Sequence, residues 1–115
     1  MFKYKKIKTT LERKRESKNV INRYPNKVPI IVEKFDNENI PDLDKHKFIV
    51  PANLTLGQFI YVIRKRIKLN PEKALFIFIN NVLPPINELI SRIYNEHKDE
   101  DGFLYIKYTT ENTYG

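Results

Sequence analysis

The chain has 115 residues, of which 41% are hydrophobic, a net charge of +7 and no cysteine. This length suits one folded domain with a single core, and the lack of cysteine excludes disulfides, thiolate metal sites and a catalytic thiol. The longest apolar run, residues 75–79, is much shorter than the roughly 20 residues that span a membrane. The basic N-terminus has no apolar segment behind it, so we expect no secretory signal.

The net charge is concentrated in residues 1–23, which hold nine Lys or Arg and two Asp or Glu residues, so that residues 24–115 are neutral overall. Residues 10–16 are good helix formers behind a threonine cap, but apolar residues in this segment are few. We therefore expect one or two short helices packed on the outside of a domain. Their basic surface suits anionic lipid, nucleic acid or an acidic protein, or is only a solvated helix face.

Two strands are expected next, over residues 28–35 and 45–51. Pro29 cannot donate to a strand ladder, so it must lie at the start of its strand or beside an unpaired edge. Pro51 ends the second strand. Both strands therefore have a proline at a position that an edge or an end of a sheet would tolerate.

The second strand has two different faces, with Phe48 and Val50 on one side and Lys47 and Ile49 on the other. At a sheet edge, its free backbone groups could take an added strand from a peptide, and Lys45 and Lys47 would attract acidic residues beside that strand. The alternative is that these lysines only protect the edge from pairing.

The clearest helix begins at Thr55, where Thr55 and Gln58 form a capping box and apolar residues follow at helical spacing until an Asn-Pro pair. Residues 74–79 are a continuous apolar run that indicates a central strand. Asn80 and Asn81 tolerate positive φ and predict a turn.

A second helix is expected around residues 87–98, followed by a strand over residues 103–108. Its inward residues should be Leu89, Ile90, Ile93 and Tyr94. The order β-β-α-β-α-β predicts an α+β protein with a β-grasp fold, in which the sheet wraps one side of the main helix. We divide the chain into a basic helical extension (1–23), a β-grasp domain (24–108) and a flexible C-terminal tail (109–115).

The last strand should place Leu104, Ile106 and Tyr108 in the core, so that Phe103 and Tyr105 face the outer surface. An exposed Phe103 beside an edge strand could then line a pocket for a peptide side chain.

The tail ends on Gly115. An unhindered glycyl carboxylate is one that an activating enzyme can adenylate and pass to a thiol, although a glycine can also stand last by chance.

An enzyme is not expected. The two histidines and two serines show no spacing of a nucleophile with a base, and the three glycines form no phosphate-binding loop. The acidic turn over residues 96–101 has no recognised metal-ligand spacing, so we expect no metal and no cofactor.

Six motifs in one order resemble the autophagy ubiquitin-like modifiers of the GABARAP type: residues 24–34 (YPNKVPIIVEK), 42–51 (DLDKHKFIVP), 54–59 (LTLGQF), 63–67 (IRKRI), 80–85 (NNVLPP) and 101–106 (DGFLYI). The resemblance covers nearly the whole chain. It implies a ubiquitin-like β-grasp with two added N-terminal helices.

The resemblance also implies a function. In this family the terminal glycine is adenylated, moves through thioesters on activating and conjugating enzymes, and is joined by an amide to phosphatidylethanolamine. Gly115 would be the acyl donor, and the covalent lipid would bring an otherwise cytoplasmic protein to the autophagosome or another organelle membrane. A cysteine protease processes or delipidates many members, and since nothing follows Gly115, the chain would be born ready, already processed or cut there.

Family members bind aromatic-x-x-aliphatic peptides of adaptors and receptors by strand addition. By resemblance, two pockets would receive the peptide: an aromatic pocket formed by Val20, Pro29, Ile31, Lys47, Ile49 and Phe103, and an aliphatic pocket formed by Phe48, Val50, Pro51, Leu54, Phe59 and Val62. Lys27, Lys45 and Arg66 would meet acidic or phosphorylated flanks.

Two other readings stay open: a basic module that binds polyanions through residues 1–23, and a β-grasp adaptor that is never conjugated. On the favoured reading we expect no nucleic-acid partner and a monomer in solution.

Overall fold

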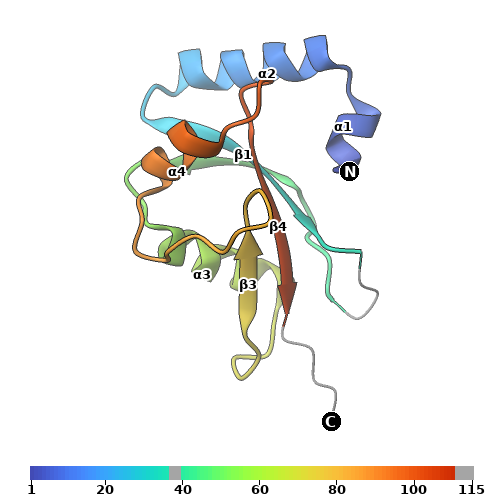
Figure 1. Ribbon diagram of the computed structural model, residues 1–115, viewed down its shortest axis with the longest axis vertical. Coiled ribbons are helices and arrows are strands. Elements are labelled where there is room, and N and C mark those ends of the chain that lie inside the picture. Colours follow the sequence, from blue (N-terminus) through green and yellow to red (C-terminus); the bar gives the residue numbers. More distant parts are fainter. Residues whose placement is uncertain (37–39, 111–115) are drawn as a thin grey trace.

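The computed structural model describes residues 1–36 and 40–110. One four-stranded sheet has the helix α3 on one face and the N-terminal helices α1 and α2 on the other side of the molecule (Figure 1). In chain order the elements are α1 (Lys3–Ile7), α2 (Thr10–Arg23), β1 (Lys27–Lys34), β2 (Lys47–Pro51), α3 (Leu56–Ile67), β3 (Leu75–Phe78), α4 (Ile90–His97) and β4 (Leu104–Thr110). The expected α+β order is confirmed. None of the helices in the described part is long and apolar enough to cross a membrane.

The strands are ordered β2-β1-β4-β3, with β1 and β4 parallel and the two outer pairs antiparallel. The apolar run before Asn80 does form a strand, but β3 is an edge strand, so the expectation of a central strand is wrong. Its apolar residues have different roles: Ile77 is buried in the core, Phe76 is 38% exposed, and Phe78 packs edge-on against Phe35 at 5.3 Å. The two inner strands are β1 and β4.

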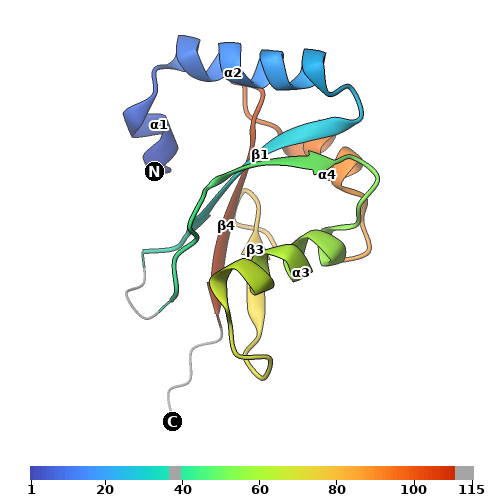
Figure 2. The ribbon, with the colours of Figure 1, turned by 180° about the vertical axis from the view of Figure 1, so that it is seen from behind.

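The helix α3 packs its apolar stripe into the main core (Figure 2). The predicted capping box is present: the Thr55 hydroxyl accepts from the Gln58 N–H at 3.2 Å, and the Gln58 side chain accepts from the Thr55 N–H at 2.9 Å. The Phe59 ring meets Phe48 of β2 edge-on at 5.6 Å. The helix ends at Ile67, because Lys68 adopts a left-handed conformation with φ of 53°.

The N-terminal helices form a second, smaller core on the sheet face opposite α3. Tyr4 of α1 packs with Ile31, Phe103 and Tyr105, and all four side chains are buried. A capping box of Thr9 and Glu12 starts α2. The segment lies outside the main core as expected, but it buries aromatic surface that its few apolar residues did not suggest.

The helix α4 begins later than predicted. Ile90, Ile93 and Tyr94 are buried as expected, whereas Leu89 is 41% exposed. Leu89 is the extended residue before the helix and forms a backbone bridge with Thr55, so it does not share the helical face. The turn at Asn80 and Asn81 is confirmed, with φ of 52° and 64°.

Candidate functional site

The strand β2 is a sheet edge. Among the described residues it pairs with β1 alone, with Val28 opposite Val50 and Ile30 opposite Phe48. Phe48 and Val50 are buried, and Ile49 on the other face is 39% exposed. The two faces predicted for this strand are therefore confirmed. Its position at the sheet edge leaves outer backbone groups that can receive another strand.

Four of the residues assigned to the aromatic pocket lie together on one face of β1 and β2. Pro29 is opposite Ile49, and Ile31 is opposite Lys47. Val20 is half-buried on α2, the helix that packs on β1. The pairing thus places an exposed apolar side chain, a lysine and a buried isoleucine beside the free edge.

Phe103 is not the exposed aromatic that the alternation predicted. Its side chain is fully buried, because Tyr4 of α1 covers it with an edge-on contact at 5.4 Å. Tyr105, on the same face of β4, is also buried. The alternation assigned the face correctly, but it could not show that another helix covers that face.

Glu16 of α2 was not identified from the sequence, and its carboxylate joins α1, α2 and β2. Its carboxylate accepts from the Tyr4 hydroxyl at 2.5 Å, from Lys47 Nζ at 2.8 Å and from Lys8 Nζ at 3.1 Å. Burial alone would raise the pKa of Glu16, but the hydrogen bonds from Lys47, Tyr4 and Lys8 outweigh it and lower the pKa to about 2. Lys47 is thereby tied to α2 and is not a free cation of the edge strand.

The residues assigned to the aliphatic pocket fall into two groups. Phe48, Val50 and Phe59 are buried in the main core. Pro51 and Leu54 are half-buried, and Val62 is 39% exposed. The surface of this set therefore consists of Pro51, Leu54 and Val62, with the other three beneath.

Two of the three predicted flanking cations share one aromatic ring. Lys45 Nζ lies 4.8 Å from the centre of the Phe48 ring, and the Arg66 guanidinium lies 5.8 Å from it. Arg66 also binds both carboxylate oxygens of Asp44 at 3.1 Å, which holds the pKa of Asp44 below its usual range. Lys27 lies apart, opposite Pro51 at the other end of β2.

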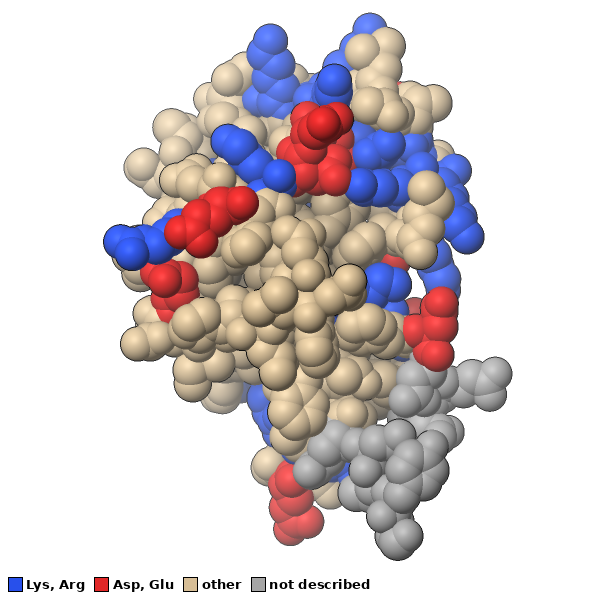
Figure 3. All heavy atoms as spheres, in the orientation of Figure 1, with Lys and Arg blue, Asp and Glu red and all other residues tan. Residues whose placement is uncertain are grey.

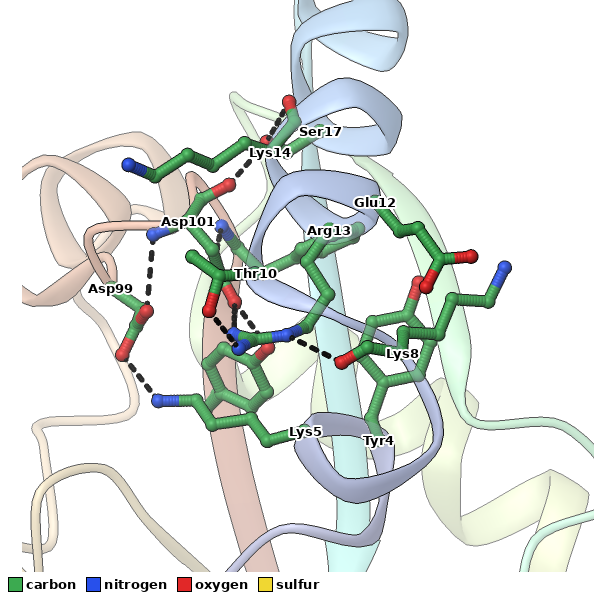
Figure 4. A network of polar contacts seen from close by, with 12 residues as sticks. Tyr4, Lys5, Lys8, Thr10, Glu12, Arg13, Lys14, Ser17, Asp99 and Asp101 are labelled. Carbon is green, nitrogen blue, oxygen red and sulfur yellow. Dashed lines mark hydrogen bonds and ion pairs between the residues drawn. The ribbon is translucent and has the colours of Figure 1, made fainter.

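A buried polar cluster fastens α2 to the start of β4 (Figure 4). Arg13 Nη1 donates to the Asp101 carboxylate at 2.5 Å, and the Tyr105 hydroxyl donates to the same oxygen at 2.5 Å. The Ser17 hydroxyl donates to the Asp101 carbonyl, and Lys5 Nζ binds Asp99 at 2.6 Å. These contacts fix the helix that presents Glu16 and Val20.

The predicted acyl donor, Gly115, lies outside the described residues, as does most of the tail. The strand β4 runs to Thr110, two residues beyond its expected end, because Thr110 pairs with Leu75 of β3. The chain therefore leaves the sheet at least two residues later than predicted.

Comparison with known proteins identifies the family. The family model "Autophagy protein Atg8 ubiquitin like" matches residues 12–115. Autophagy-related protein 8B of Oryza sativa subsp. japonica is 57% identical over 96% of this chain and 93% of its own length. Autophagy-related protein 8 of Saccharomyces cerevisiae is 58% identical over 90% of this chain and 89% of its own length.

Two solved structures have the same fold. The crystal structure of Trypanosoma brucei ATG8 superposes with a TM-score of 0.94 at 45% identity, covering 100% of this chain and 99% of that chain. Plasmodium falciparum Atg8 in complex with a Plasmodium falciparum Atg3 peptide gives a TM-score of 0.87 at 30% identity, covering 95% and 96%. The chain therefore belongs to the Atg8 family of autophagy ubiquitin-like proteins.

Proposed function

We propose that this autophagy modifier is joined through Gly115 to phosphatidylethanolamine and recruits aromatic-x-x-aliphatic peptides along the free edge of β2. The partners are activating and conjugating enzymes, a processing or delipidating cysteine protease, and adaptor or receptor peptides. The chain itself is not an enzyme and works as a monomer, cytoplasmic before conjugation and on autophagosomal or related membranes after it. The Atg3 peptide bound to the Plasmodium relative supports a conjugating-enzyme partner of the same kind.

The proposal that β2 binds peptides rests on one observation: β2 is an open sheet edge, and Ile49 is exposed on it. A strand added there would bond to the backbone of β2, and its side chains would lie over Ile49 and Lys47 on one face. Phe48 and Val50 give the strand a buried face that anchors the edge to the main core. Lys45 adds positive charge beside it, whereas Arg66 is ion-paired with Asp44.

The polyanion reading is less well supported. Lys and Arg do gather over the end of the molecule that carries α1 and α2 (Figure 3). However, Lys5, Lys8 and Arg13 are ion-paired to Asp99, Glu16 and Asp101 within the protein. Part of the basic character of residues 1–23 therefore stabilises the fold.

The conjugation half is tested with Gly115→Ala in a reconstituted reaction containing activating and conjugating enzymes and phosphatidylethanolamine vesicles. We expect no thioester and no lipid-linked product on a denaturing gel, because a Cβ blocks the narrow approach to the carboxylate. Peptide affinity serves as the control and should stay unchanged. Normal lipid attachment by the alanine variant would refute the acyl-donor role.

The peptide half is tested with Ile49→Ala by calorimetry against an acidic-flanked aromatic-x-x-aliphatic peptide. We expect about a tenfold weaker affinity, roughly 1.4 kcal/mol. Phe76→Ala is the matched control, because Phe76 is 38% exposed on the opposite edge strand and should have no effect. Equal losses in both variants would place the peptide elsewhere. Phe103→Ala is unsuitable here, since removing a buried ring costs about 3–5 kcal/mol of folding stability.

A further inference from the structure

A hollow at the C-terminal end of α3 is lined by cations that the β2 site does not use. Arg64, Lys65, Lys68 and Lys73 line this basic hollow, whose volume is about 590 Å³. Glu72 is the carboxylate among its lining residues. Four cations against one anion leave a net charge of +3 on a small part of the surface.

The charges of the basic hollow are not neutralised by the protein. Lys65, Lys68 and Lys73 form no ion pair with any carboxylate in the part of the chain that the structure describes. Arg64 donates to the backbone carbonyls of Asn70 at 3.2 Å and Pro71 at 3.3 Å, which orient its guanidinium and leave it charged. An anionic surface is the complementary partner.

The backbone at Lys68 is a second, independent observation. Lys68 has φ of 53° and ψ of 41°, the left-handed conformation that usually falls to glycine at the end of a helix. The helix dipole favours a cation near the end of α3. A lysine in the last helical turn would supply that cation with an ordinary helical backbone, so the dipole does not explain the left-handed conformation of Lys68. A lysine in this strained conformation, without an ion pair among the described residues and at the rim of a cationic hollow, indicates a functional use of the side chain.

The basic hollow lies at the end of the molecule where β4 ends. The loop after α3 leads directly into Leu75, which pairs with Thr110, the last residue of β4. Figures 1 and 2 both show this loop near the end of β4, with α2 at the opposite end of the molecule. The molecule is 47 Å long, whereas the five residues after Thr110 can span at most about 18 Å.

We propose that the basic hollow binds the anionic phospholipid headgroups of the bilayer to which Gly115 is attached, and so orients the modifier with α2 pointing away from the membrane. This inference rests on the proposed conjugation, which brings the hollow to the bilayer. Proximity decides which cations act, because charges interact over only about 8 Å at physiological salt. The cations on α2 lie at the opposite end of the molecule and reach the bilayer only if the protein tips onto its side.

The orientation can be measured without the conjugation enzymes. A histidine tag added after Gly115 attaches the full chain to vesicles that contain a nickel-chelating lipid. Since the chain has no cysteine, Asn19→Cys on α2 takes a single donor dye, and the vesicle membrane carries the acceptor. We expect less energy transfer on phosphatidylcholine vesicles containing phosphatidylserine than on phosphatidylcholine alone, because the anionic lipid holds α2 away from the bilayer.

Charge-reversal variants identify the cations that act. Lys65→Glu with Lys68→Glu should restore the energy transfer seen on neutral vesicles, and so should 1 M salt. Lys14→Glu with Lys18→Glu is the matched control on α2 and should behave like the parent protein. Lys68→Gly should raise the thermal midpoint, because it relieves the left-handed lysine, and yet weaken the orientation.

Three outcomes would overturn the proposal. Energy transfer that rises on anionic vesicles would show that the α2 end binds the membrane. Equal effects of the two double variants would show a general charge effect. Loss of the orientation with inorganic phosphate at matched ionic strength would show a site for single anions. Because the histidine tag replaces the lipid as the tether, this measurement does not depend on conjugation of Gly115. A failure of the conjugation test and a failure of the orientation test can therefore be distinguished.

Discussion

Glu16 connects the edge strand β2 to the N-terminal helices. Its carboxylate accepts hydrogen bonds from Lys47 on β2 and from Tyr4 on α1, and it is ion-paired with Lys8, the residue that follows α1. A peptide with an acidic residue beside its core motif would compete with Glu16 for Lys47. If the proposed peptide binds at this edge, its binding is linked to the docking of α1 through a single carboxylate.

Glu16 also makes stability depend on pH. Its pKa is lowered from 4.5 to about 2 in the folded protein, so it contributes stability that is complete above pH 4.5 and is lost as pH falls towards 2. We expect Glu16→Gln to lower the free energy of unfolding by about 1–2 kcal/mol at pH 7, a value discounted for partial exposure. Urea melts should show the difference from the parent protein shrinking between pH 4.5 and pH 2. A difference that stays constant across this range would mean that the ion pairs do not stabilise the fold.

At the level of elements, the start of α3 and the faces of β2 could be predicted because they depend on local chemistry. The capping box at Thr55, the turn at Asn80 and Asn81, and the two faces of β2 all follow from neighbouring residues. The order of the strands in the sheet could not be predicted. An edge strand that exposes aromatic residues has the same continuous apolar sequence as a central strand. The burial of Phe103 was missed for a related reason, since it depends on a helix nearly a hundred residues earlier in the chain.

The α3 cap offers a direct test of this local reasoning. Thr55→Ala should lower the free energy of unfolding by about 1 kcal/mol, because the N–H of Gln58 loses its acceptor. Thr55→Ser keeps a hydroxyl and should lose much less in the same urea titration. If serine and alanine cost the same, the contribution of Thr55 comes from its methyl group and not from the cap.

The whole molecule has two cores, one on each face of a single sheet. The larger one lies under α3, and the smaller one, under α1, contains Tyr4, Ile31, Phe103 and Tyr105. Glu33 holds α1 in place by accepting from the backbone N–H groups of Lys3 at 2.8 Å and Tyr4 at 2.9 Å. The N-terminal helices are therefore part of the folded body and do not behave as an independent arm.

Removal of residues 1–8 tests this view. The deletion uncovers Phe103 and Ile31, and we expect the free energy of unfolding to fall by about 3 kcal/mol and a dye that reports exposed apolar surface to bind. Ile7→Ala is the control within α1, because Ile7 is 76% exposed and should change neither measurement. An unchanged denaturation midpoint after the deletion would show that α1 is dispensable for the second core.

The parallel pairing of β1 with β4 has a consequence for synthesis on the ribosome. It joins Ile30 to Leu104, so the sheet has no centre until the last part of the chain has been made. Contacts between such distant residues form slowly, and β2 with β3 cannot build a sheet by themselves. A nascent chain interrupted before residue 104 would thus remain unfolded and open to degradation. Because β4 pairs with both β1 and β3, the sheet is complete only after residues 104–110 have been synthesised.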